Sequence, residues 1–265
     1  MFYQGRSYFN ALELQLAKRM SHGFQVQGTY TWGKSMDTSS ATLAGDAFGN
    51  SISSLNWFDM KLTRGLSDFD VKRTLVVNGT WEIPSAKSWT GPAKWATDGW
   101  ELGMIFTVSD GVPFTPTWGT GDDPANTLNH DDFAFPNRLG GAGCSTLTNP
   151  GNPNNYIKTQ CFAVPNPTNL RGNAGRNIII GPGVTNLDFS VFKNNRVKKI
   201  SENFNAQFRV EMFNIMNHPN FAPPGPGDGN TDIFLSNTNP SGLAGKLIRT
   251  TIPERQIQVA LKIVF

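Results

Sequence analysis

The chain has 265 residues, a formal net charge of +3, 27 glycines, 17 prolines and only 16% charged residues. The composition lacks the Ala, Glu, Lys and Leu enrichment of long helical proteins, and the small charge excess gives no sign of a nucleic-acid partner. No apolar run approaches the ~20 residues that a membrane-spanning helix needs, which excludes a helical membrane protein.

Seven segments alternate apolar and polar residues with a period of two. This is the period of a β-strand, whose side chains point to opposite faces in turn. Their lengths suit tilted membrane-spanning strands, which need about 9–11 residues. In chain order they lie at 7–20, 23–32, 75–83, 100–109, around 187–191, 204–212 and 254–265.

The last segment carries the clearest pattern. Its apolar residues occupy every second position from Ile257 to Phe265, and Gln256, Gln258 and Lys262 fill most of the gaps. Such a strand suits a boundary between hydrocarbon and water, and in water an aromatic terminal strand would be an exposed, sticky edge. The residues predicted to face lipid are Leu12, Leu14, Leu16, Phe106, Phe208, Val259, Leu261 and Phe265.

The polar faces distinguish two all-β architectures. A β-sandwich turns its polar face to open solvent, whereas here that face is rich in Gln, Asn, Thr and Ser, as a hydrated barrel lumen would be. Trp32, Trp81, Trp100 and Phe265 lie toward strand ends, where a barrel has its aromatic girdles. The sequence therefore favours an antiparallel up-and-down transmembrane β-barrel, with the sandwich kept as the alternative.

The connections alternate between short and long, which is typical of up-and-down barrels with short periplasmic turns and long extracellular loops. This predicts extracellular loops at 38–66, 111–183 and 217–253, with two further short strands above the membrane at 112–118 and 245–250. The C-terminus is expected in the periplasm. Because single-chain bacterial barrels have even strand numbers, seven strands suggest that residues 1–265 form one C-terminal segment of a larger barrel.

Few residues point to a chemical site. Cys144 and Cys161, in one Gly/Pro/Asn-rich stretch, predict a loop disulfide rather than a metal site. Trp118, Asp122 and Asp123, in the longest loop, are the candidate ligand contacts. The three histidines, His22, His130 and His218, are too far apart to suggest metal ligands. We expect no metal, no cofactor and no enzymatic activity.

Several stretches resemble the C-terminal barrel of TonB-dependent receptors, in particular the Oar-like type, which often carries an N-terminal carboxypeptidase-regulatory-like domain. They are DFDVKRTLVVNGTWEIP at 68–84, GVPFTP at 111–116, GRNIIIGPG at 175–183, NLDFSVFK at 186–193, QFRVEMFNIMNHPNF at 207–221 and the terminal RQIQVALKIVF.

The resemblance implies a barrel of about 22 strands in the outer membrane of a Gram-negative bacterium, surrounded by outer-membrane lipid. Within the family, an N-terminal plug domain connects the barrel to TonB, and the barrel-assembly machinery recognises the C-terminal strand. The sequence contains neither a plug nor a TonB box.

The expected function is therefore to take part in the uptake of a scarce nutrient, whose chemistry is left open. A small self-contained outer-membrane barrel or porin-like pore is the first alternative. A secreted β-sandwich that binds glycans is the second.

Overall fold

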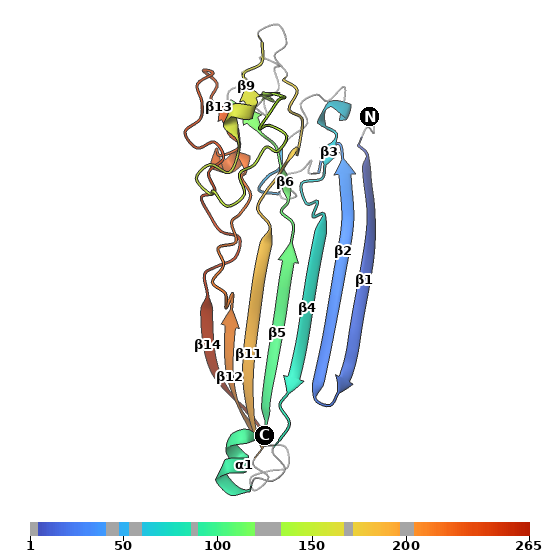
Figure 1. Cartoon of the computed structure of the whole chain (residues 1–265), viewed down its shortest axis with the longest axis vertical. Coiled ribbons are helices and arrows are strands. Elements are labelled where there is room, and N and C mark those ends of the chain that lie inside the picture. The colour runs from blue at the N-terminus through green and yellow to red at the C-terminus, as the bar shows by residue number, and fades with distance from the viewer. Residues whose placement is uncertain are drawn as a thin grey trace.

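The computed structural model describes residues 5–40, 48–52, 60–85, 90–119, 134–166, 172–196 and 204–265. The described chain has two parts, a sheet of long strands and a head of loops and short strands at one end of that sheet (Figure 1). The C-terminus and the short helix α1 (Gly91–Thr97) lie at the opposite end of the sheet.

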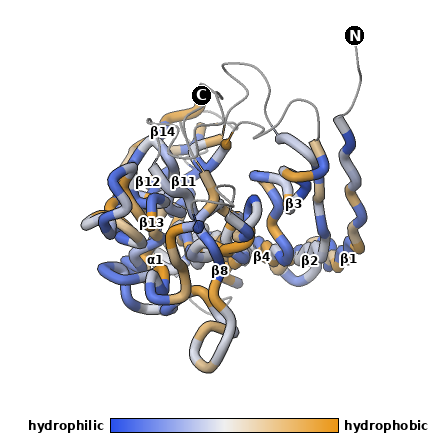
Figure 2. Tube along the Cα trace, turned by 90° about the horizontal axis from the view of Figure 1, so that it is seen from above, coloured by the Kyte–Doolittle hydropathy of each residue, from blue (hydrophilic) through white to orange (hydrophobic). Residues whose placement is uncertain are grey.

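Seven long strands follow one another in the sheet in the order of the sequence, each antiparallel to the next. They are β1 (Ser7–Ser21), β2 (Phe24–Asp37), β4 (Arg73–Glu82), β5 (Trp100–Ser109), β11 (Val184–Arg196), β12 (Asn205–Phe213) and β14 (Gln256–Val264). This order confirms the predicted up-and-down arrangement. Seen from above, the strands follow a curved, open path from β1 to β14 (Figure 2).

The remaining elements are short. The strands are β3 (Gly65–Leu66), β6 (Pro113–Phe114), β7 (Thr117–Trp118), β8 (Asn137–Arg138), β9 (Phe162–Ala163), β10 (Ile179–Ile180) and β13 (Asp232–Phe234), and the 3-10 helices are η1 (Met60–Thr63), η2 (Thr159–Cys161) and η3 (Pro226–Asp228). None of the helices in the described ranges has the length and apolar composition to span a membrane.

Two connections differ from what the sequence predicted. The predicted strand at 245–250 is wrong, because Gly245 lies in a turn with a left-handed φ of 68°, and 246–249 form no strand before the single bridge from Thr250 to Phe221. Helix α1, in the connection between β4 and β5, was not predicted. It is only seven residues long, too short for a helical period to stand out.

The turn between β1 and β2 explains why these strands pair so closely. His22 and Gly23 both have positive φ, 54° and 75°, as the two central residues of a type I′ hairpin turn do. A Cβ at Gly23 would lie 2.6 Å from the carbonyl oxygen of Glu82, so the adjacent strand requires glycine here as well. The turn pairs Ser21 with Phe24, and a register shift between Lys18 and Ser21 separates this pair from the rest of the hairpin, in which Leu14 lies opposite Tyr30.

The hydrophobic core lies in the head and not against the sheet. Phe114, Ile157, Ile179 and Ile233 are at most 1% exposed, and all four come from the long connections. On the described residues of the seven long strands, no hydrophobic side chain is buried. A sheet without a core of its own must be stabilised by something outside the described chain.

Candidate functional site

One face of the sheet is apolar and open. Trp81 and Met104, on the central strands β4 and β5, are 43% and 38% exposed, so the exposure is not confined to the edges. Leu16, Val259 and Leu261, on the edge strands, are 81%, 61% and 66% exposed. Full burial of such a side chain is worth about 1.5–3 kcal/mol, and each partly exposed one forgoes a share of this in water. The contiguous face marks an interaction surface.

Strand register makes this apolar face continuous. Side chains of matching character lie opposite each other from strand to strand, so the apolar positions form rows across the sheet. One row is Phe24, Trp81, Leu102, Val191, Val210 and Val259, and another is Leu14, Tyr30, Leu75 and Val108.

The height of the apolar face matches a bilayer. On β2 the face runs from Phe24 to Trp32, which spans about 27 Å at roughly 3.4 Å per residue. With the strands tilted by about 35–45°, this face would be about 19–22 Å tall, close to the apolar band of about 25 Å in outer-membrane barrels. Aromatic side chains mark both limits, with Trp81 beside Phe24 at the α1 end and Trp32 at the head end.

The opposite face is polar. Its rows carry hydroxyls, amides and a few charges, and they include Gln15, Thr29, Val76, Thr107 and Asn186, then Gln25, Thr80, Gly103, Ser190, Glu211 and Gln258. Asp188 accepts hydrogen bonds from the side chain of Asn186 and the backbone N–H of Asn214, both at 2.9 Å. A wetted surface suits these groups, because burial without partners would be costly.

A lysine interrupts the apolar face near the α1 end. Lys193 lies in the row between Trp100 and Phe208. Its Nζ donates hydrogen bonds to the carbonyl oxygens of Trp95, at 2.7 Å, and Asp98, and it lies 5.5 Å and 5.6 Å from the ring centroids of Trp95 and Trp100. This cluster was not predicted from the sequence, although a lysine two positions after Val191 on an apolar face was the available signal.

A buried arginine joins the head to the top of the sheet. Arg176 forms ion pairs with Asp37, at the end of β2, and with Asp68, at 3.3 Å. Its Nε donates to the carbonyl oxygen of Thr63 at 2.9 Å. All three charged side chains are at most 4% exposed. The connection from β5 to β11 is therefore tied to the connection from β2 to β4.

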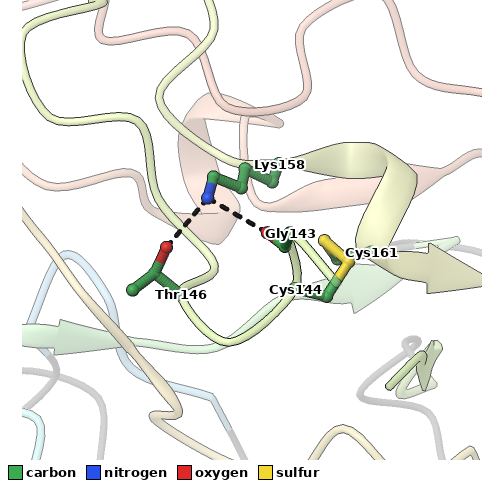
Figure 3. The surroundings of a disulfide bond; sticks show 5 residues. All are labelled: Gly143, Cys144, Thr146, Lys158 and Cys161. Carbon is green, nitrogen blue, oxygen red and sulfur yellow. Dashed lines mark hydrogen bonds between the residues drawn. A yellow bond between two sulfur atoms is a disulfide. The ribbon is translucent and has the colours of Figure 1, made fainter. Parts of the chain in front are cut away.

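A disulfide closes part of the head. Cys144 and Cys161 are bonded, with Cα atoms 5.5 Å apart (Figure 3). Lys158 lies beside it and donates hydrogen bonds to Gly143 O at 3.1 Å and Thr146 Oγ1 at 2.8 Å (Figure 3). Nearby, burial raises the pKa of Tyr156 to about 12, and its hydroxyl donates to Ile180 O at 2.8 Å.

The candidate ligand residues do not form a visible site. Trp118 is only 4% exposed, and its Nε1 donates to Leu235 O at 3.0 Å, so the indole belongs to the packing of the head. Asp122 and Asp123 lie outside the described residues, as does His130. A ligand contact at these positions stays a prediction.

The residues predicted to face lipid share the apolar face of the sheet. Their positions follow from the strand register, and all are exposed except Phe106, which is half-buried between Val77 and Leu187. The set is Leu12, Leu14, Leu16, Phe106, Phe208, Val259, Leu261 and Phe265, the last lying just beyond β14.

Among the described residues, no three His, Cys, Asp or Glu side chains come together in a group that could hold a metal ion. His22 forms the turn between β1 and β2, and His218 contacts the Asn220 side chain at 3.3 Å.

Comparison with known proteins gives one match. A family model described as an outer membrane beta barrel domain matches residues 1–258. No curated protein and no solved structure matches the chain.

Proposed function

The chain belongs to the family of outer membrane beta barrel domains, and from this we propose that it forms part of the wall of a TonB-dependent receptor that takes up a scarce nutrient. The observation that carries the proposal is the continuous, open apolar face of the sheet, backed by a polar face and joined to a folded head. Lipid covers the apolar face, and water fills the interior that the polar face lines.

The two sheet edges support a larger barrel. β1 and β14 are the ends of the strand order and do not pair with each other. An open edge leaves backbone N–H and C=O groups without partners, which hydrocarbon does not tolerate. We therefore propose that additional strands lie between β14 and β1, which would bring the barrel toward the roughly 22 strands of plugged transporters.

The loop lengths support an orientation. Short connections lie at the α1 end and long ones at the head end (Figure 1), and barrels have short periplasmic turns and long extracellular loops. On this basis we propose that the C-terminus lies in the periplasm and the head lies outside the cell, where it would meet the ligand first. The proposed role is transport and not catalysis.

Spin labels test the membrane part of the proposal. Labels at Leu14, Phe208 and Leu261 in the full-length protein in native outer membranes should be accessible to oxygen dissolved in lipid and protected from an aqueous nickel quencher. Labels at Thr29 and Thr107, on the polar face, are the matched controls and should show the reverse. Equal quenching by nickel on both faces would refute the assignment of the apolar face to lipid.

Uptake assays test the transport part. Cells that express the full gene are given labelled cobalamin, ferric siderophore, oligosaccharide and peptide probes, with and without TonB. Saturable uptake of one probe that requires TonB is expected. Uptake of several small probes in proportion to concentration, unchanged without TonB, would indicate a porin-like pore instead.

A further inference from the structure

The head end of the apolar face carries a cluster of cations at the level where hydrocarbon should give way to headgroups. Leu12, Trp32 and Arg73 share one row across β1, β2 and β4, and the next row toward the head pairs Asn10 with Lys34. Lys72 directly precedes Arg73. The apolar face therefore ends in a basic rim, defined here as Lys34, Lys72 and Arg73.

A cavity of about 770 Å³ lies at this rim. Leu12 and Trp32 contribute apolar surface from the sheet, and Leu66 and Ile180 contribute it from the head. The three cations of the basic rim also line it, together with Asp70 and Asp110. The cavity thus joins an apolar surface to a charged one, which suits a ligand with both characters.

The two carboxylates that line the cavity do not neutralise all three cations of the basic rim. Asp110 forms a two-bond ion pair with Arg73, at 2.7 Å and 2.9 Å. Asp70 is 6% exposed, and its carboxylate accepts the backbone N–H of Ser35 at 2.5 Å. Lys34 and Lys72 are exposed, and neither forms an ion pair with a residue in the described ranges.

A fourth cation lies higher on the same face. The guanidinium of Arg64 is 5.9 Å from the ring centroid of Tyr8, which precedes Asn10 on the outward face of β1. Lysine and arginine side chains at a membrane surface attract anionic headgroups by about 1 kcal/mol each. Arginine and lysine are also the side chains that bind phosphate oxygens.

We propose that the basic rim binds the phosphorylated headgroup of a lipid in the outer leaflet, with an acyl chain against Leu12 and Trp32. A free anion would use the cations but would leave the apolar half of the cavity without a ligand. The inference rests on the proposed membrane insertion, because only insertion brings a lipid headgroup to the level of Lys34 and Arg73.

Lipid binding to the purified full-length protein in detergent tests this assignment. The probes are bisphosphorylated lipid A, its monophosphorylated form, phosphatidylcholine and inorganic phosphate, followed by native mass spectrometry. Bisphosphorylated lipid A should bind more tightly than the monophosphorylated form, phosphatidylcholine should bind weakly, and millimolar inorganic phosphate should not displace the lipid. Equal binding of phosphatidylcholine, or displacement by inorganic phosphate, would overturn the lipid assignment.

Three variants make the test specific. The double variant Lys34→Gln/Lys72→Gln should weaken lipid A binding roughly tenfold or more. Asp110→Asn should strengthen it, because it releases Arg73 from its ion pair. Lys262→Gln removes the same charge from the polar face of β14 and should leave binding unchanged. Unchanged binding in the double variant would refute the site.

The spin-label experiment separates this inference from the function on which it rests. If the labels at Leu14 and Leu261 are exposed to lipid but the substitution of Lys34 and Lys72 does not change lipid A binding, only the headgroup site is wrong. If those labels report water, both proposals fail.

Discussion

Arg176 and Asp37 are 139 positions apart in the sequence, yet their side chains form an ion pair that is almost fully buried. Asp68 completes the cluster, and Asn177 adds a hydrogen bond of 2.6 Å to the same carboxylate. This cluster holds the longest loop over the end of β2. It gives the head a fixed position above the sheet.

Removing the arginine should loosen the head. Arg176→Met leaves Asp37 and Asp68 buried without a cation, and breaking a buried pair from one side typically costs about 3–5 kcal/mol. We expect rapid protease cleavage of the head in the folded, membrane-inserted protein. Arg249→Met is the control, since its ion pair with Asp228 is exposed and such pairs contribute only about 0–1 kcal/mol. Equal protease resistance of both variants would contradict a stabilising role for the cluster.

The disulfide should stabilise the head measurably. Cys144 and Cys161 enclose a loop with a sequence separation of 17, and closing a loop of about 15 residues stabilises a fold by roughly 3 kcal/mol. Cys144→Ser/Cys161→Ser should lower the melting temperature of the head while the sheet keeps its β-sheet circular dichroism. A loss of both signals together would mean that head and sheet unfold as one unit.

The burial of Tyr156 predicts an alkaline limit to head stability. Its pKa rises from an ordinary 10.0 to about 12. Below pH 10 the phenol is neutral whether the head is folded or not, so the buried phenol makes its full contribution to the stability of the head. Between pH 10 and about 12 only the unfolded chain releases the proton, so stability falls as pH rises. Tyr156→Phe should flatten the fall in melting temperature across this range. If the melting temperature of the variant falls as steeply with pH, other groups cause the loss of stability.

Lys193 should hold α1 in place. Its Nζ bonds two carbonyl groups of the helix and its C-terminal turn, and hydrogen bonds from charged groups are worth about 1.5–3 kcal/mol. Lys193→Met should speed amide exchange of residues 91–98 without changing β5 or β11. Lys94→Met, at an exposed position on α1, is the matched control. Equal exchange in the two variants would show that α1 is ordered by other contacts.

Neighbouring residues on β5 offer a direct comparison of the two faces. Phe106→Arg places a charge on the apolar face, where the cost near the bilayer midplane is about 2–4 kcal/mol. Thr107→Arg places the same charge on the polar face and should cost much less. Urea unfolding of the full-length protein in lipid vesicles measures both changes, and a larger effect at Thr107 would reverse the assignment of the faces.

The sequence by itself determined the seven strands and their two faces. A strand exposes alternate residues to opposite sides, so local spacing alone predicts that one face carries Ile257, Val259 and Leu261. It also marked the cysteines that are bonded. It failed at α1, which is too short to show a helical period, and at 245–250, where a strand was predicted and none forms.

Only the tertiary structure decided how the long loops pack. Arg176 meets Asp37 because the pairing of the four strands β2, β4, β5 and β11 brings the end of β2 and the connection before β11 to the same end of the sheet, and no local pattern encodes that meeting. For the same reason Trp118, which was a candidate ligand contact because it lies in the longest loop, is packed into the head against Leu235. In the basic rim, Lys34 comes from β2, Arg73 from β4 and Lys72 from the residue before β4, and they form one patch only once Trp32 and Arg73 are paired.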